Sequence, residues 1–343
     1  MPILKFVSWN MEWMNDLFDE AGNYRADGDH PQHADKNVTV LQRRKDLSGV
    51  INEISPDVIV IIEGPNKSIE LQRFFDTDVQ GTWKVTVQAS VGSAQCIGCA
   101  VRTDTGKLDA TSPMNIIDSA TVAAFNPFEA DNDDDGVMEK YRFERLPLYV
   151  EIKTSDQKKF RVLGLHLKSK GIFDAYEWSK WWSISDGNRK KIMAQCSQVR
   201  QKFADPYLQD VATKDIPIII CGDINDGPGL DASEKRLFGS GIERLMGNVW
   251  LPLLCFGNAL FDSLTKKEKD ELKFENIFTT TFKDPIFNNV WHKDWIDHIL
   301  YSHLKLQWIK KGMVYLKMND GKPIYQKYKH ASDHMPVGAE IDL

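Results

Sequence analysis

The sequence predicts a layered α/β or α+β fold. Short apolar runs alternate along the chain with amphipathic stretches of helical spacing, as in strands that pack against helices. The composition of 343 residues, 42% hydrophobic and 27% charged, is ordinary for a globular protein and excludes disordered, collagen-like and coiled-coil chains. At about 150 residues per domain this length suggests two domains, although single α/β domains reach the same size.

The first part of the chain contains two strand signals and one helix signal. Residues 3–8 and the apolar run 57–62 are typical of strands. Residues 37–54 between them carry apolar side chains at close to helical spacing, and Pro56 ends this helix because a residue before proline disfavours the helical region. The apolar positions of the predicted helix are Val40, Leu47, Ile51 and Ile54.

The same rules predict the later elements. Two strand pairs are expected, at 83–89 with 97–102 and at 148–153 with 160–167. An amphipathic helix is expected over 188–203, with Ile192, Cys196, Val199 and Phe203 on its apolar stripe. Further strands are expected at 216–221, 296–301 and 337–341.

Polar stretches separate these elements. Long surface loops are expected near 19–36, 103–140 and 168–187, and another polar stretch covers 262–273. Because strand signals recur on both sides of the polar stretches, and no repeat or flexible linker is evident, we favour one domain over residues 1–343 to two domains.

Charge and cysteine content narrow the class of protein. The net charge of −6 speaks against tight nucleic-acid binding, since lysine and arginine normally drive phosphate binding. The isolated C-x-x-C of Cys96 and Cys99 favours reduced core thiols over zinc or a disulfide. No apolar run reaches about 18 residues and the N-terminus lacks a signal-peptide core. We therefore expect no transmembrane segment and a cytoplasmic monomer, or a secreted protein if a signal has been removed.

Residues 131–136 form an acidic stretch that resembles part of a calcium-binding loop. Asp131, Asp133, Asp135 and Gly136 match the first half of an EF-hand calcium loop. The twelfth position holds Arg142 where glutamate is required, and no flanking helix pair is evident. We favour a solvated acidic loop and keep a casual Ca²⁺ site at 131–136 as the alternative.

Polar side chains follow the most apolar runs, at the points where the predicted strands end. In layered α/β folds, catalytic groups cluster at such points. One Asp or Asn after a strand is more often a turn former or a helix cap, but six such segments in one chain indicate a site. They contain Asn10, Glu63, His166, Asp223 with Asn225, Asp297 with His298, and Asp333 with His334.

The order of these segments resembles the endonuclease/exonuclease/phosphatase superfamily, the deoxyribonuclease I-like fold. The matching segments are SWNMEWM, PDVIVIIEG, HLKSK, IICGDINDGPG, WIDHILYS and ASDHMPVGAEI, and they span residues 8–341. The resemblance implies a four-layer sandwich of two packed mixed β-sheets flanked by helices. The HLKSK segment and residues 142–148 look most like a nuclease-like branch. One departure is Ile62, which stands before Glu63 where the family usually has glutamine, so the support of Glu63 or the fit of the substrate differs.

The resemblance also implies a metal-dependent hydrolysis of phosphodiesters. Carboxylate and amide oxygens suit Mg²⁺ or Mn²⁺ better than zinc, and the implied metal ligands are Asn10, Glu63 and Asp333. Asp223 would orient or deprotonate the attacking water, and Asn225 would bind a phosphate oxygen or that water. Being separated by one residue, both side chains can face the same way if the segment is extended.

Histidines and basic residues complete the implied site. His334 would donate a hydrogen bond or proton to the phosphate, with Asp297 on its other ring nitrogen. His166 would lie on the opposite side of the phosphate. His298 would point to the other face of its strand and is expected to be structural. The candidates for substrate binding are Arg145, Lys168 and Lys170.

Three functions fit this site. The favoured one is a nuclease that cleaves DNA or RNA by in-line attack of an activated water and holds nucleic acid transiently. The alternative is a phosphatase or phosphodiesterase acting on a small or lipid phosphate of the inositol phosphate or sphingomyelin type. A lipid enzyme should expose an apolar hairpin, for which residues 249–256 are a candidate, although a buried segment is expected there. Retention of the full polar set argues against the third, a non-catalytic binding module.

Overall fold

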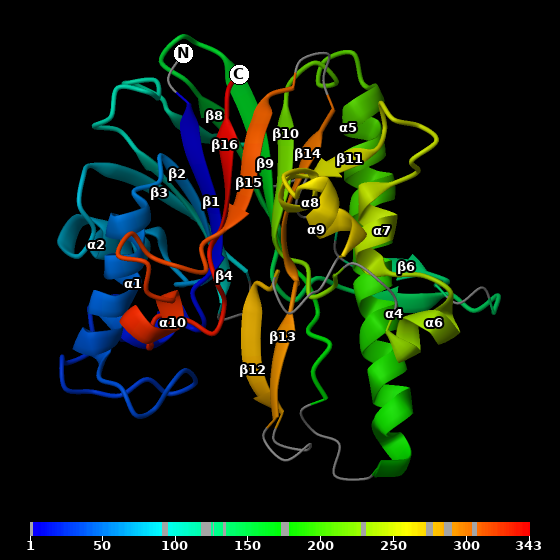
Figure 1. Cartoon of the computed structure of the whole chain (residues 1–343), viewed down its shortest axis with the longest axis horizontal. Coiled ribbons are helices and arrows are strands. Elements are labelled where there is room, and N and C mark those ends of the chain that lie inside the picture. The colour runs from blue at the N-terminus through cyan, green and yellow to red at the C-terminus, as the bar shows by residue number, and fades with distance from the viewer. Residues whose placement is uncertain are drawn as a thin grey trace.

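The fold consists of two six-stranded mixed sheets packed face to face, with helices on both outer faces (Figure 1). The computed structural model describes residues 3–90, 95–117, 125, 127–132, 135–172, 178–227, 231–271, 277–284, 290–303 and 307–343. The predicted four-layer sandwich of two mixed sheets between helices is confirmed.

The two sheets follow the same pairing scheme. The strands of sheet one, in spatial order, are β15 (Ile309–Val314), β16 (Val337–Ile341), β1 (Leu4–Asn10), β2 (Val58–Gly64), β4 (Cys96–Arg102) and β3 (Trp83–Gln88). Those of sheet two are β11 (Phe256–Asn258), β14 (Asp297–Ser302), β10 (Ile218–Asp223), β9 (Lys159–His166), β8 (Leu148–Lys153) and β5 (Met114–Ile116). Only the central pairs, β1 with β2 and β9 with β10, are parallel among these described strands.

Helices cover the outer faces, and two small hairpins stand beside the sheets. Against sheet one pack α1 (Val40–Ile54) and α2 (Ser68–Thr77), and against sheet two pack α4 (Trp181–Val199), the π-helical turn η3 (Arg200–Ala204), α5 (Asp205–Gln209) and α7 (Gly241–Met246). The shorter helices are η1 (Met14–Leu17), η2 (Trp178–Lys180), α6 (Ala232–Leu237), α8 (Ala259–Asp262), α9 (Lys266–Asp270) and α10 (Ile324–Lys327). The hairpins are β6 (Phe128–Ala130) with β7 (Glu139–Tyr141), and β12 (Thr280–Asp284) with β13 (Val290–Asp294).

Strand alternation builds three apolar layers. In β1, Phe6 points between the sheets, whereas Val7 and Trp9 pack under α1 and η1. In β10, Ile219 and Cys221 point between the sheets, whereas the even-numbered residues Ile218 and Ile220 pack under α4. The inward side of each strand is therefore fixed by the parity of its residue numbers, and this parity also decides which polar residues at the strand ends face inward.

The predicted helices differ from the observed ones mainly at their ends. The helix predicted over 37–54 begins at Val40, capped by the Thr39 side chain, and ends where Ser55 adopts a left-handed conformation before Pro56. The helix predicted over 188–203 begins earlier, at Trp181, so part of the predicted loop 168–187 is wrong. The short strands β5 and β6 also lie inside the predicted loop 103–140, and β7 begins at its end.

The five cysteines are free and buried, and Cys99 lies in the core between the sheets. Within the described ranges, no helix combines the length and the apolar character needed to cross a bilayer.

Candidate active site

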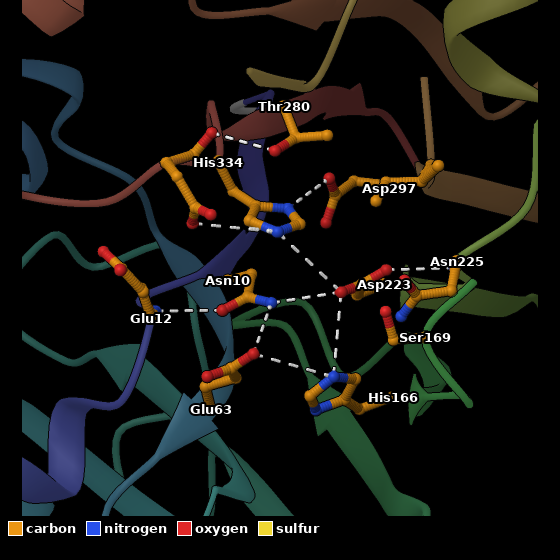
Figure 2. A network of polar contacts seen from close by, with 12 residues as sticks. Asn10, Glu12, Glu63, His166, Ser169, Asp223, Asn225, Thr280, Asp297 and His334 are labelled. Atoms are coloured by element: carbon orange, nitrogen blue, oxygen red, sulfur yellow. Dashed lines mark hydrogen bonds and ion pairs between the residues drawn. The ribbon is translucent and has the colours of Figure 1, made fainter. Parts of the chain in front are cut away.

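The ends of the two parallel strand pairs bring polar side chains together. Asn10 is the last residue of β1, and Asp223 at the end of β10 lies opposite His166 of β9 and Asp297 of β14. Each of these four residues shares its parity with the inward-facing apolar residues of its strand, such as Phe6, Ile219 and Ile299. The side chains therefore gather at one edge of the space between the sheets, as Figure 2 shows.

Glu63 reaches the same place through a break in its strand. The alternation in β2 sends Ile61 toward the helices, so a regular strand would send Glu63 outward as well. The pairing of β2 with β4 shifts register between Ile61 and Gly64, and Glu63 has a φ of 57°. Such an irregularity re-aims a side chain. Glu63 accepts hydrogen bonds from Asn10 Nδ2 at 3.1 Å, from Trp13 N at 3.0 Å and from Gln95 Nε2.

Gln95 supplies a contact that the sequence did not reveal. Ile62 replaces the glutamine expected before Glu63, but Gln95, the residue just before β4, donates to the Glu63 carboxylate. Arg145 Nη2 in turn donates to Gln95 Oε1 at 2.7 Å. The glutamate is therefore supported by an amide from the segment before β4, and no pattern in the sequence marks this residue.

Asn10 lies between the carboxylates of Glu63 and Asp223, one from each pair of parallel strands. Its Nδ2 donates to Glu63 Oε1 and to Asp223 Oδ2, each at 3.1 Å, and its Oδ1 accepts from Glu12 N at 2.9 Å. An amide oxygen has two acceptor sites, so one remains for a further donor or a cation.

Asp223 is buried, and its charge is poorly compensated. Burial, followed by the repulsion from Asp297, raises the pKa of Asp223 to about 7. The positive charge of His334 opposes this rise. Asp223 is therefore poised to hold or release a proton near neutral pH, as a catalytic carboxylate requires.

The segment after Asp223 is not extended, so the expected geometry for Asn225 is wrong. The strand ends at Asp223, and Asn225 is left-handed with a φ of 56°. Its backbone N donates to Asp223 Oδ1 at 3.0 Å, which is a turn stabilised by the aspartate, and its Nδ2 donates to Leu167 O at 3.3 Å. The two residues still lie side by side (Figure 2), held by the turn and by the neighbouring strand.

His334 is held as a charged imidazolium. Its Nδ1 donates to Asp297 Oδ2 at 2.8 Å, while its Nε2 lies 3.9 Å from an oxygen of Asp223 and 3.9 Å from one of Asp333. Burial disfavours the charge, but Asp297, Asp333 and Asp223 outweigh it and hold the pKa of His334 well above its usual value. The Nε2 proton therefore points at the centre of the site.

His166 has the opposite character. Burial, then the charges of Arg145 and His334, lowers its pKa well below the usual value, so the ring is neutral. Its Nε2 lies 3.7 Å from Glu63 Oε1 and 3.7 Å from Asp223 Oδ2, beyond direct hydrogen bonding, and its Nδ1 is buried without a partner within the described structure. At this separation a bridging water or substrate oxygen fits between the groups.

Glu12 belongs to the site, although the sequence analysis assigned it no role. Burial, then the repulsion from Asp333, raises its pKa to about 7, with Glu63 adding to the rise and Arg43 opposing it. Its φ of 43° turns the chain just after Asn10 (Figure 2). The available signal was its position two residues after Asn10 in an otherwise apolar segment.

Asp333 is half exposed at the mouth of the site. Its side chain is 45% exposed, and its backbone O accepts from Thr280 Oγ1 at 3.0 Å and from Thr281 N at 3.1 Å. The base of the β12–β13 hairpin thus fixes the loop that carries Asp333 and His334.

The three basic candidates have different surroundings. Arg145 lies beside the site through Gln95 and its charge acts on His166. Lys168 follows the site strand, and its backbone N donates to Gln195 Oε1 at 2.9 Å. Lys170 is 2.6 Å from Asp226 and 2.5 Å from Glu234, two buried carboxylates. These carboxylates already hold the ammonium, and the assignment of Lys170 as a phosphate contact stays a prediction.

Two other expectations concern residues around the site. His298 points away from it, as expected: Nδ1 accepts from Asn258 Nδ2 at 3.0 Å and Nε2 donates to Asp226 O at 2.8 Å. In the acidic loop, Asp131 Oδ2 accepts from Gly136 N at 2.9 Å. Asp133 lies outside the described residues, so the casual Ca²⁺ site keeps the status of a prediction.

The donor set fits a hard divalent cation. Burial is the main cause of the raised pKa of Glu12, and repulsion from Asp333 and Glu63 adds to it; a cation between these carboxylates would relieve that repulsion. Asp223, Asp297 and His334 also have ligand atoms within 4.8 Å of one another. In that second group, however, Asp297 and His334 already bond to each other, so we favour the first group as the metal-binding set.

Comparison with known proteins establishes the fold. No protein-family profile and no curated protein matches the sequence. An endonuclease/exonuclease/phosphatase from Bacteroides vulgatus is similar over 100% of both chains, with a TM-score of 0.54 and 14% identity. A truncated TDP2 from Caenorhabditis elegans is similar over 99% of this chain and 98% of its own, with a TM-score of 0.51 and 13% identity. The resemblance seen in the sequence is thus confirmed at the level of the fold.

Proposed function

We propose, on the premise that the chain has the endonuclease/exonuclease/phosphatase fold, that it is a divalent-metal-dependent phosphodiester hydrolase acting on nucleic acid. The convergence of Asn10, Glu63, His166, Asp223 and His334 at one edge of the two sheets carries the proposal. Five strand ends and the loop before β16 bring together acids, an amide and two histidines, of which His334 is charged and His166 is neutral. This arrangement matches the needs of phosphodiester hydrolysis: a proton acceptor for water, donors for phosphoryl oxygens and oxygen ligands for a cation.

Glu12, Glu63 and Asp333, with Asn10 beside them, would hold Mg²⁺ or Mn²⁺. When bound, such a cation neutralises phosphoryl charge and lowers the pKa of water. Both ions are proposed because both prefer carboxylate and amide oxygens as ligands.

The protein's own groups then take separate roles. Asp223 accepts the proton of the attacking water, while Asn10 and the backbone N of Asn225 hold its carboxylate in place. His334, charged and oriented by Asp297, donates its Nε2 proton to a phosphoryl oxygen. Neutral His166 donates from the other side, where its Nε2 lies 3.7 Å from both Glu63 and Asp223.

The test is an activity panel with site variants. Single-stranded DNA, RNA, duplex DNA and a small chromogenic phosphodiester are incubated with Mg²⁺ or Mn²⁺, with and without a chelator. Asp223→Ala and His334→Ala should each lower kcat/KM by about 10²- to 10⁴-fold, because each removes a proton-transfer group. Asp19→Ala, on the exposed loop, serves as the matched control.

Two results would contradict this function. Cleavage that persists in the chelator removes the role of the cation, and full activity in both variants removes the role of the site. Hydrolysis of the small diester alone would favour the alternative class of substrate.

A lipid phosphate is the second candidate, because the 249–253 loop is exposed. Trp250 is 86% exposed and Leu253 77% exposed, contrary to the expectation of a buried segment. The loop leads into β11, where Phe256 pairs with Ser302 at the far end of β14 from Asp297. The six residues of β14 separate these ends by roughly 17 Å. An anchored loop would hold the membrane away from the site, so we favour nucleic acid.

A further inference from the structure

An aromatic pair stands next to the site and has no place in the proposed chemistry. The ring of Trp13 stacks on the ring of His33 with 4.2 Å between centroids and 15° between planes. Trp13 is half buried, yet among the described residues it belongs to none of the three apolar clusters that form the core. Packing of the core therefore does not account for this pair.

The pair is fixed to the site at one end. Trp13 N donates to Oε2 of Glu63, a proposed metal ligand, at 3.0 Å. Trp13 also directly follows Glu12, another proposed metal ligand. Glu12 and Trp13 both adopt left-handed conformations, with φ of 43° and 52°. This conformation is unusual for a bulky residue, whereas glycine would adopt it freely. Arg43 holds the turn by donating to the carbonyls of Met11 and Glu12.

The pair is fixed to a buried carboxylate at the other end. Asp16 is 2% exposed and accepts from His33 N at 2.7 Å, from His33 Nδ1 at 2.9 Å and from Ala34 N at 3.2 Å. These bonds set both the backbone and the ring of His33, whose side chain remains 48% exposed. The stacked surface is thus rigid before any ligand arrives, and rigid aromatic surfaces bind flat ligands at low entropic cost.

We propose that Trp13 and His33 form a stacking platform for an unpaired nucleobase beside the scissile phosphate, which makes single-stranded nucleic acid the substrate. This inference rests on the proposed function. Bases inside a duplex stack on one another, whereas an unpaired base offers its face to an aromatic ring. A chain with a net charge of −6 gains little from general attraction to phosphate, and stacking supplies affinity that does not depend on charge.

The test compares two oligomers of equal length and charge. One is oligothymidylate, and the other carries an abasic tetrahydrofuran residue at every position. For the wild type, kcat/KM should be higher for the oligomer with bases. In Trp13→Ala the ratio of the two kcat/KM values should fall by about 5- to 140-fold, the loss expected for one stacked base. Trp13→Phe, which keeps an aromatic face, should restore part of the ratio.

Controls separate the possible failures. Trp250→Ala removes an exposed tryptophan at the far end of the sheet and should leave the ratio unchanged. His33→Ala tests the platform from an exposed loop if Trp13→Ala does not fold, and it should lower the ratio as well.

The outcomes distinguish the platform from the function beneath it. Equal losses on both oligomers in Trp13→Ala and in His33→Ala, or no preference for bases in the wild type, would overturn the platform while the hydrolase stands. If the wild type cleaves neither oligomer, or if Asp223→Ala cleaves both normally, the nuclease proposal fails and the platform fails with it.

Discussion

Glu12 and Asp223 both carry a raised pKa of about 7, and they show what single residues contribute to this site. In each case burial is the first cause and a neighbouring carboxylate the second. The carboxyl group of a fully exposed Asp or Glu has a pKa of about 4 and is already ionised at neutral pH. The positive charges of Arg43 and His334 therefore offset only part of the negative charge in the site.

Glu12→Gln should raise the thermal stability of the metal-free protein. The pKa of Glu12 is raised above its value of 4.5 in the unfolded chain, so the folded state loses stability as the pH rises from 4.5 to about 7, and the full penalty is present above about 7. At about pH 8 we expect Tm to rise by about 1–3 °C in the variant. We also expect a smaller rise of Tm on adding Mn²⁺, because a ligand is lost.

Differential scanning calorimetry with and without Mn²⁺ measures both effects. Glu20→Gln, in an exposed loop, is the control and should change neither value. An equal Mn²⁺-induced rise in wild type and Glu12→Gln would exclude Glu12 from the cation site.

His298 should make the protein less stable in acid. Burial lowers its pKa below 6.5, so the folded protein keeps the ring neutral while the unfolded chain takes up a proton. The stability contributed by the neutral ring is complete above pH 6.5 and is lost as the pH falls from there toward the folded pKa. The loss of unfolding free energy between about pH 7.5 and 5.5 should be smaller in His298→Gln than in the wild type.

Urea denaturation at the two pH values measures this difference. His303 is exposed, so His303→Gln should retain the slope of the wild type. An unchanged slope in His298→Gln would show that its neutral form is not maintained by folding.

At the scale of elements, β9 and β10 depend on one glycine. Gly222 has a φ of +127°, and a Cβ there would lie 2.0 Å from Leu165 O of the neighbouring strand. The two strands can approach closely beside Asp223 only because this position has no side chain.

Gly222→Ala should therefore destabilise the protein by about 3 kcal/mol or more. Gly28→Ala is the matched control, since nothing lies within 4 Å of a Cβ built there, and its effect should stay within about 0.5 kcal/mol. Urea unfolding of both variants is the measurement. Equal stability of the two would mean that the strands separate readily at Gly222.

The elements that could be predicted from the sequence are those whose apolar residues indicate that the segment is buried. The runs that became β2 and β10 are apolar on both faces because they lie between the core and the helices, and such runs are easy to recognise. The edge strand β15 was missed because it contains two exposed lysines and a bulge after Ile309. Its place comes from pairing with β16, which no local pattern reports.

The same distinction applies to the site. Residues at strand ends were predicted because polar side chains follow the apolar runs and because the segments resemble a known superfamily. Contacts made by turns and bulges were not: the aim of Glu63 comes from a register shift, the place of Asn225 from a turn, and the support by Gln95 from the segment before β4. These depend on tertiary contacts, which the sequence of one strand does not contain.

At the scale of the whole molecule, the layer between the sheets joins both halves of the site. Leu148 of sheet two and Val60 of sheet one are fully buried in the same apolar cluster. Asn10 and Glu63 come from one sheet, and His166 and Asp223 from the other. We infer that the chain forms one cooperative domain, because both sheets contribute to the same buried apolar cluster.

Leu148→Ala tests this inference. It should lower the free energy of unfolding by about 2–5 kcal/mol, whereas Leu253→Ala, 77% exposed, should change it by less than about 0.5 kcal/mol. In urea, activity and far-ultraviolet circular dichroism should be lost in one coincident transition for the wild type and for Leu148→Ala. Two separate transitions would show that the halves unfold independently.

The pairing of β1 with β16 has a consequence for protein synthesis. Leu4 lies opposite Ile341, and His334 precedes β16 by only a few residues. While a ribosome is still extending the chain, β1 lacks one of its two neighbouring strands and the site lacks its charged histidine. The site is therefore incomplete until translation has passed residue 341, so an activity that needs His334 would begin only after the last strand of sheet one has been made.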